Sequence, residues 1–95
     1  MTFKVPEFDL ADESIQFVFE FGGAEYRIPF MQYIPLPAFE GAQKRGGVGH
    51  IPVLEELGLD DAVKAFKSMS PQQVKVLTDA WTKASTASLG ESAAS

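Results

Sequence analysis

The residues that could do chemistry in this 95-residue chain are few and widely spaced. His50 is the only histidine, and as a general base it would need a nucleophile and a group that orients it. The sequence contains serines and aspartates but no nucleophile elbow. It has no cysteine, which excludes thiol nucleophiles, disulfides and thiolate zinc sites. We therefore expect His50 to be a loop residue without a catalytic role, in a protein that is not an enzyme.

Two other patterns resemble ligand sites but lack the required residues. Gly46-Gly47-Val48-Gly49 is followed by His50, whereas a phosphate loop needs a lysine and then a serine or threonine where its helix starts. Three acidic pairs occur, at Asp12-Glu13, Glu55-Glu56 and Asp60-Asp61. Neighbours in sequence do not share a helix face, and none of the pairs continues with the alternating oxygen ligands of a calcium loop. We expect no metal ion and no cofactor.

The charge balance narrows the classes of partner. Thirteen Asp and Glu face eight Lys and Arg, which gives a net charge of −5. Binding to nucleic acid or to anionic membranes depends on basic residues, so neither is expected as a partner. No apolar run approaches the roughly 18 residues of a membrane span. The first ten residues also lack the basic start and apolar block of a signal peptide. The composition predicts a small, soluble, cytoplasmic domain.

Residues 15–30 carry the clearest structural signal, an alternation of apolar side chains around a glycine pair. The apolar positions are Ile15, Phe17, Phe19, Phe21, Tyr26, Ile28 and Phe30. Gly22-Gly23 can supply the positive φ of a tight turn, so the segment predicts an antiparallel hairpin with an aromatic face. We favour a four-residue loop, which sets Glu20 opposite Arg27, over a two-residue loop, which sets Glu20 opposite Glu25.

The remaining segments predict an α+β fold in which short helices pack against the hairpin. Ser70, Pro71 and Gln73 match the N-cap, first position and capping-box position of one helix. Along that helix, Leu77 and Trp81 lie on one face. Residues 1–14 are predicted to form an extended arm, with the option of a third strand. Residues 15–85 form the domain, which has three to four helices at about 37–45, 52–57, 60–69 and 71–85. Residues 86–95 are predicted to be a disordered, flexible tail.

The aromatic content suggests where a partner could bind. Eight Phe, two Tyr and one Trp are a high load for 95 residues, concentrated in the first half of the chain. Most of these side chains should build the core, but a hairpin with one aromatic face and few helices can leave an apolar patch exposed. Trp81 is expected in the core by its helical spacing, with an interface anchor as the alternative. The candidate partner-binding residues are Phe17, Phe19, Tyr33, Phe39, Leu77 and Trp81.

The order of these parts resembles the small tail assembly chaperones of long-tailed, siphovirus-type phages or prophages of actinobacteria. The similarity rests on Gly22-Gly23-Ala24-Glu25-Tyr26 followed by Ile28-Pro29, on Ala80-Trp81 with Ala84-Ser85, and on the Ser88–Ser95 tail. It covers about residues 15–95. The resemblance implies a protein that binds and solubilises the tape-measure protein in the cytoplasm of the infected host. It also implies recruitment of tail-tube subunits and absence from the mature virion.

Two alternatives to a chaperone remain at this point. A structural virion component, such as a small tail or head–tail joining subunit, would pair its hairpin edge with a neighbouring subunit. A host regulator or adaptor unrelated to phage is the other. A lone hairpin is marginally stable in water, so either helix packing or self-association must support it.

Overall fold

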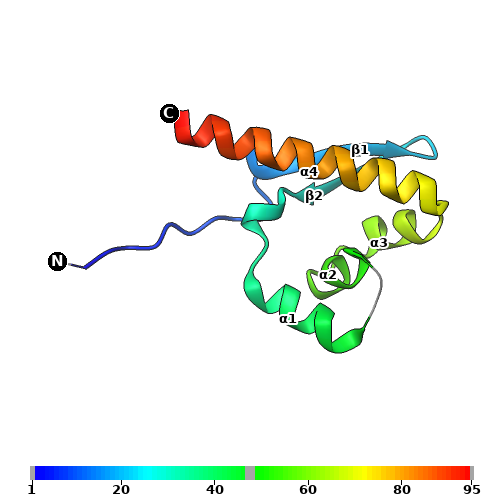
Figure 1. Ribbon diagram of the computed structural model, residues 1–95, viewed down its shortest axis with the longest axis horizontal. Helices are drawn as coiled ribbons and strands as arrows, with labels where there is room; N and C mark the ends of the chain where they lie inside the picture. Colours follow the sequence, from blue (N-terminus) through cyan, green and yellow to red (C-terminus); the bar gives the residue numbers. More distant parts are fainter. Residues whose placement is uncertain (1, 47–48, 95) are drawn as a thin grey trace.

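The computed structural model describes residues 2–46 and 49–94, with residues 88–94 described by their backbone alone. The fold is α+β, as predicted: one hairpin lies against four α-helices (Figure 1). The elements are η1 (Glu13–Ile15), β1 (Gln16–Phe21), β2 (Ala24–Pro29), η2 (Met31–Tyr33), α1 (Leu36–Arg45), α2 (Ile51–Glu56), α3 (Asp60–Lys67) and α4 (Pro71–Ala94). Gly47 and Val48 of the glycine-rich motif lie outside the described residues.

The hairpin turn has two residues, and the predicted four-residue loop is wrong. Gly22 and Gly23 have φ values of 62° and 81°, the double left-handed conformation of a type I′ turn. The register sets Glu20 opposite Glu25. A type I′ turn matches the natural twist of the strands, and both carboxylates face water, which weakens their repulsion. Turn geometry therefore outweighs the cross-strand charge pairing on which the prediction depended.

The aromatic face of the hairpin forms one wall of the core. Phe19 stacks on Tyr26 across the strands at a ring-centroid distance of 5.3 Å and meets Phe66 of α3 edge-on at 5.8 Å. Ile28 is fully buried beside them. Trp81 of α4 closes the core from the other side and is also fully buried, which confirms its prediction as a core residue. The sheet has two strands, so within the described residues the arm adds no third strand.

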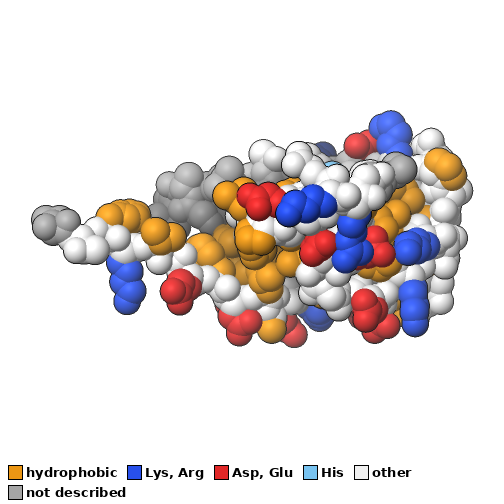
Figure 2. All heavy atoms as spheres, turned by 90° about the horizontal axis from the view of Figure 1, so that it is seen from below, with side chains coloured by type: hydrophobic (Ala, Val, Ile, Leu, Met, Phe, Trp, Pro, Cys, Tyr) orange, Lys and Arg blue, Asp and Glu red, His pale blue; other side chains and the backbone are white. Residues whose placement is uncertain are grey.

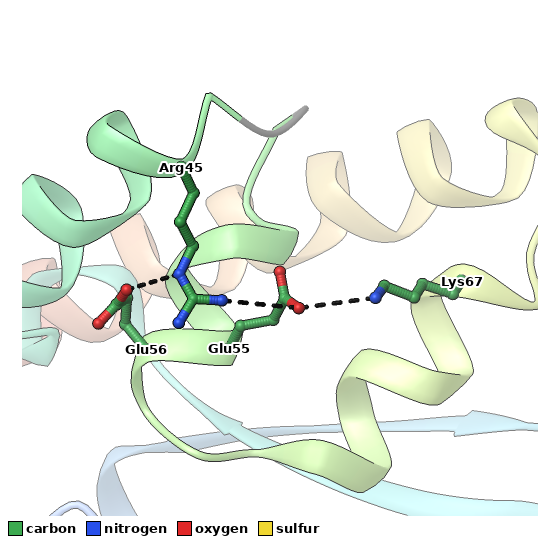
Figure 3. A network of polar contacts seen from close by, with 4 residues as sticks. All are labelled: Arg45, Glu55, Glu56 and Lys67. Carbon is green, nitrogen blue, oxygen red and sulfur yellow. Dashed lines mark hydrogen bonds and ion pairs between the residues drawn. The ribbon is translucent and has the colours of Figure 1, made fainter.

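The three short helices begin and end within two residues of their predicted bounds. An ion-pair network on one face joins them (Figure 3). Arg45 of α1 contacts Glu56 at 2.7 Å and Glu55 at 3.8 Å on α2, and Lys67 of α3 contacts Glu55 at 3.6 Å. Pairs this exposed contribute about 1 kcal/mol at most, so the network orients helices that apolar packing holds.

Helix α4 begins at the predicted cap. Ser70 N donates to Gln73 Oε1 at 2.8 Å, and Gln73 N donates to Ser70 Oγ at 3.2 Å, which is a reciprocal capping box. The helix extends through Ala94, nine residues beyond the predicted end at residue 85. The added segment contains no proline, and its alanines and Leu89 favour a helix, whereas Gly90 and the serines favour it less. Flexibility of residues 86–95 stays a prediction, and Ser95 lies outside the described residues.

The N-terminal arm projects away from the body on the same side as the end of α4 (Figure 1). Residues 2–9 have no regular secondary structure. Phe8 touches the body, with its ring 4.7 Å from Tyr33 in an edge-on arrangement. Phe3 and Val5, in contrast, are 77% and 72% exposed. The arm therefore carries large apolar side chains that the rest of this chain does not cover.

Candidate partner-binding groove

The six candidate residues do not form one continuous surface. Phe19 and Trp81 are core residues with exposed fractions of 7% and 0%. The Trp81 indole Nε1 donates a buried hydrogen bond of 3.0 Å to the Pro29 carbonyl, which ties α4 to the end of β2. Neither side chain can anchor a partner while the fold is intact, although both hold the elements that line the surface described next.

Phe17 and Leu77 come together in an apolar groove between β1 and α4. The groove has a volume of about 460 Å³, and Phe19 lies at its base. Its lining residues are Phe17, Phe19, Glu20, Phe21, Met69, Gln72, Gln73, Val76, Leu77 and Ala80. We call this surface the β1–α4 groove. It joins residues of the hairpin with residues about 50 positions later in the chain.

The chemistry of the β1–α4 groove is that of apolar recognition. Val76 is 58% exposed, and Phe17, Phe21 and Leu77 are half-buried. The polar members are the side chains of Glu20, Gln72 and Gln73, all exposed. A contiguous apolar surface with a polar border is typical of protein–protein contact sites. The groove can therefore accept apolar side chains of a partner and can hold its polar groups at the border.

Sequence reasoning missed several residues of this groove. Phe21 belongs to the predicted aromatic face and could have been included with Phe17. Val76 and Ala80 lie outside the buried face of α4, so the helical spacing of apolar residues gave no reason to select them. Met69 precedes the helix, and its position depends on how α3 and α4 connect. Which side of α4 lies along β1 is set by packing between segments far apart in sequence.

Tyr33 and Phe39 lie at other places. Tyr33 is in η2, where it packs against Phe8 of the arm. Phe39 is on α1 and lines a separate small cavity of about 230 Å³ with His50 and Val53. Each is half-buried. The structure therefore places Tyr33 and Phe39 outside the β1–α4 groove, and their role as partner-binding residues stays a prediction.

His50 lies in the turn before α2, and its side chain is half-buried. Its ring meets the Trp81 ring edge-on at 5.2 Å, and burial lowers the pKa of the imidazole below its ordinary value. It also lines a second cavity of about 620 Å³ across α4, with Phe66, Val74 and the lysines Lys67 and Lys75 on the border. No cluster of three His, Cys, Asp or Glu side chains suited to a metal ion exists in the described part of the chain.

Comparison of the chain with protein-family models, with curated proteins and with solved structures gave no match. Within residues 2–46 and 49–94, no helix combines the length and apolar character needed to cross a membrane. The β1–α4 groove is therefore the feature of the structure that best supports a function.

Proposed function

We propose that this protein is a phage tail assembly chaperone that binds and solubilises the tape-measure protein and helps recruit tail-tube subunits. The observation that carries the proposal is the β1–α4 groove, which brings Phe17 and Leu77 of the predicted binding set to one apolar surface. The resemblance of the sequence motifs to those of small tail assembly chaperones supports one occupant for the groove, an apolar helical segment of the tape-measure protein. Its place of action is the cytoplasm of the infected bacterium.

The groove suits such an occupant because its apolar side chains are only partly covered. A helix that inserts side chains three and four positions apart would complete the burial of Phe17, Phe21, Val76 and Leu77. Each Å² of apolar surface removed from water contributes about 25 cal/mol before the cost of association. A groove of this size supports reversible binding of one segment at a time. The net charge of −5 would keep a complex with an apolar partner in solution.

Co-expression with the tape-measure protein of the same genome tests the proposal. The readout is the amount of soluble tape-measure protein that co-purifies with the tagged chain. We expect a soluble complex with the natural chain and an insoluble partner without it. If the partner stays insoluble although the tagged chain is soluble, the chaperone function is refuted.

A pair of matched variants tests the site. Val76→Asp places a charge in the groove at a side chain that is 58% exposed, so the fold should tolerate it. Leu36→Asp makes the same kind of change at a side chain 74% exposed on α1, outside the groove. We expect Val76→Asp to lose the partner and Leu36→Asp to keep it. Equal capture by both variants would show that another surface binds.

Mass spectrometry of purified phage particles distinguishes the chaperone from the alternative, a structural virion component. A chaperone should be absent or present in traces, because it leaves before the particle is complete. A structural subunit must be present in a fixed copy number. Detection at fixed stoichiometry would therefore replace the chaperone proposal.

A further inference from the structure

The outer edge of β1 has free backbone groups. Phe30 N donates to Ile15 O at 2.9 Å, so these two residues form a hydrogen-bonded pair of the ladder. In an antiparallel ladder such pairs alternate with pairs that are not hydrogen-bonded, and the register continues this alternation up to the turn. In the pairs between, Val18 and Glu20 direct their N–H and C=O groups away from β2. Gln16 N donates to Glu13 O at the end of η1, so the free part of this edge begins at Val18. For residues 17–29 of the described chain, no backbone–backbone hydrogen bond outside the hairpin is formed. This edge can accept another strand.

The outer edge of β2 is closed at its end. Pro29 has no N–H to offer, and its carbonyl already accepts the bond from Trp81 Nε1. Glu25 and Arg27 of β2 also direct their backbone groups outward, so the side chains decide between the two edges. The edge of β1 lies beside Phe17 and Phe21 of the β1–α4 groove and carries Glu20. The edge of β2, in contrast, carries Arg27, which would repel Lys4 of an added strand.

The N-terminal arm has the pattern of such a strand. Phe3 and Val5 alternate with Thr2 and Lys4, which places the apolar pair on one side of an extended segment. Figure 2 shows the hydrophobic side chains of the arm on one side and its charged side chains on the other. Pro6 ends the run, since it cannot donate to a ladder.

We propose that residues 2–5 of a second copy of this chain add to the outer edge of β1 as a third strand. Phe3 and Val5 then continue the apolar face of β1 next to Phe17 and Phe21. Lys4 emerges on the opposite face, where Glu20 lies opposite Glu25 and lacks a cation directly across the hairpin. The added strand thus covers exposed apolar surface and places a positive charge beside a pair of negative ones.

A second copy is favoured over the chain's own arm by the geometry of the connection. Asp12 N donates to Asp9 O at 2.9 Å, and residues 13–15 follow as a 3-10 helix, so two turns separate the arm from β1. They direct the arm away from the body (Figure 1). Exchange of two such arms produces a closed, two-fold dimer. This inference does not depend on the proposed function.

Cysteine cross-linking tests the exchange cleanly, because the chain has no cysteine of its own. A Lys4→Cys chain is mixed with a Glu20→Cys chain and oxidised, and mixed-composition dimers are counted by mass spectrometry. The control mixture replaces Glu20→Cys with Lys44→Cys, an exposed position on α1. We expect at least about tenfold more mixed dimer from the first mixture than from the control. Equal yields from both mixtures would overturn the proposal.

Two further measurements keep the outcome unambiguous. The first is oxidation of a Lys4→Cys/Glu20→Cys double variant. A disulfide within one chain, seen at monomer mass, would show that the chain's own arm forms the third strand, and would overturn the exchange. In sedimentation, the unmodified chain should form dimers with rising concentration. Phe3→Ser/Val5→Ser should weaken that association by about tenfold or more, whereas Leu36→Ser should not. A chain that stays monomeric at about 100 µM contradicts the proposal.

Discussion

Replacement of Trp81 by phenylalanine tests whether this residue holds the fold or binds a partner. Trp81 is fully buried, its indole N–H donates to the Pro29 carbonyl at 3.0 Å, and its ring contacts His50. Trp81→Phe keeps an aromatic ring but removes the donor and part of the volume. The Pro29 carbonyl then remains in the interior without a partner. The substitution therefore attacks one hydrogen bond and the packing around it.

The expected loss follows from these two effects. An unpaired buried polar group costs about 1–3 kcal/mol. The smaller ring adds roughly 1 kcal/mol for lost contacts and residual space. The sum, about 2–4 kcal/mol, is a large part of the roughly 5–10 kcal/mol that stabilises a small domain. For a chain of this length it corresponds to a fall in Tm of about 8–30 °C.

Urea denaturation followed by far-UV circular dichroism measures the free energy of unfolding without the fluorescence of Trp81 itself. Val76→Ala is the control, since it shortens a side chain on the same helix that is 58% exposed, and we expect a change within about 0.5 kcal/mol. A loss below about 0.5 kcal/mol for Trp81→Phe would refute the reasoning. The alternative role of Trp81, an anchor in an interface with a partner, would then be favoured.

Three smaller predictions follow from single contacts. Glu20→Lys should raise the free energy of unfolding by about 0.2–1 kcal/mol, because it faces Glu25; in the four-residue-loop register it would face Arg27, and stability would fall instead. Ser70→Ala should cost about 1 kcal/mol through loss of the α4 cap, and an unchanged denaturation midpoint would contradict this. The lowered pKa of His50 means that the unfolded state binds its proton more readily. Its contribution to stability should be complete above pH 6.5 and lost as pH falls below it. The difference in stability between the natural chain and His50→Asn should therefore shrink on acidification, and a constant difference would exclude this role.

Local signals were sufficient to predict the elements of the fold. The alternation around Gly22-Gly23 identifies the hairpin because residues two apart share a face, and the Ser70 cap identifies the start of α4 because its partners lie within three residues. The register was harder, because it required weighing turn geometry against one charge pair. The end of α4 was not given by the pattern, because Gly90 and a run of small residues have weak helix propensity, whereas the backbone continues as a helix through Ala94.

The candidate site was only partly predictable, because it depends on contacts between distant segments. Phe17 and Leu77 were found from their positions on two amphipathic faces. Val76 was not, since its exposure depends on which side of α4 meets β1. The bond from Trp81 to Pro29 spans 52 positions, and no local pattern reports it. That contact occupies the Pro29 carbonyl at the end of β2.

The two interaction sites proposed here share strand β1, and this makes their dependence on each other asymmetric. Side chains of one β1 face line the groove, whereas the outward backbone groups of Val18 and Glu20 define the edge. A charge at Val76 acts on the groove but leaves the edge unchanged, so Val76→Asp should still dimerise. An added arm extends the apolar face with Phe3 and Val5, so loss of the arm should reduce partner capture as well as association. If loss of the arm weakens dimerisation but leaves partner capture unchanged, the arm binds away from β1. Only a strand beside Phe17 and Phe21 can enlarge the surface on which the partner lies.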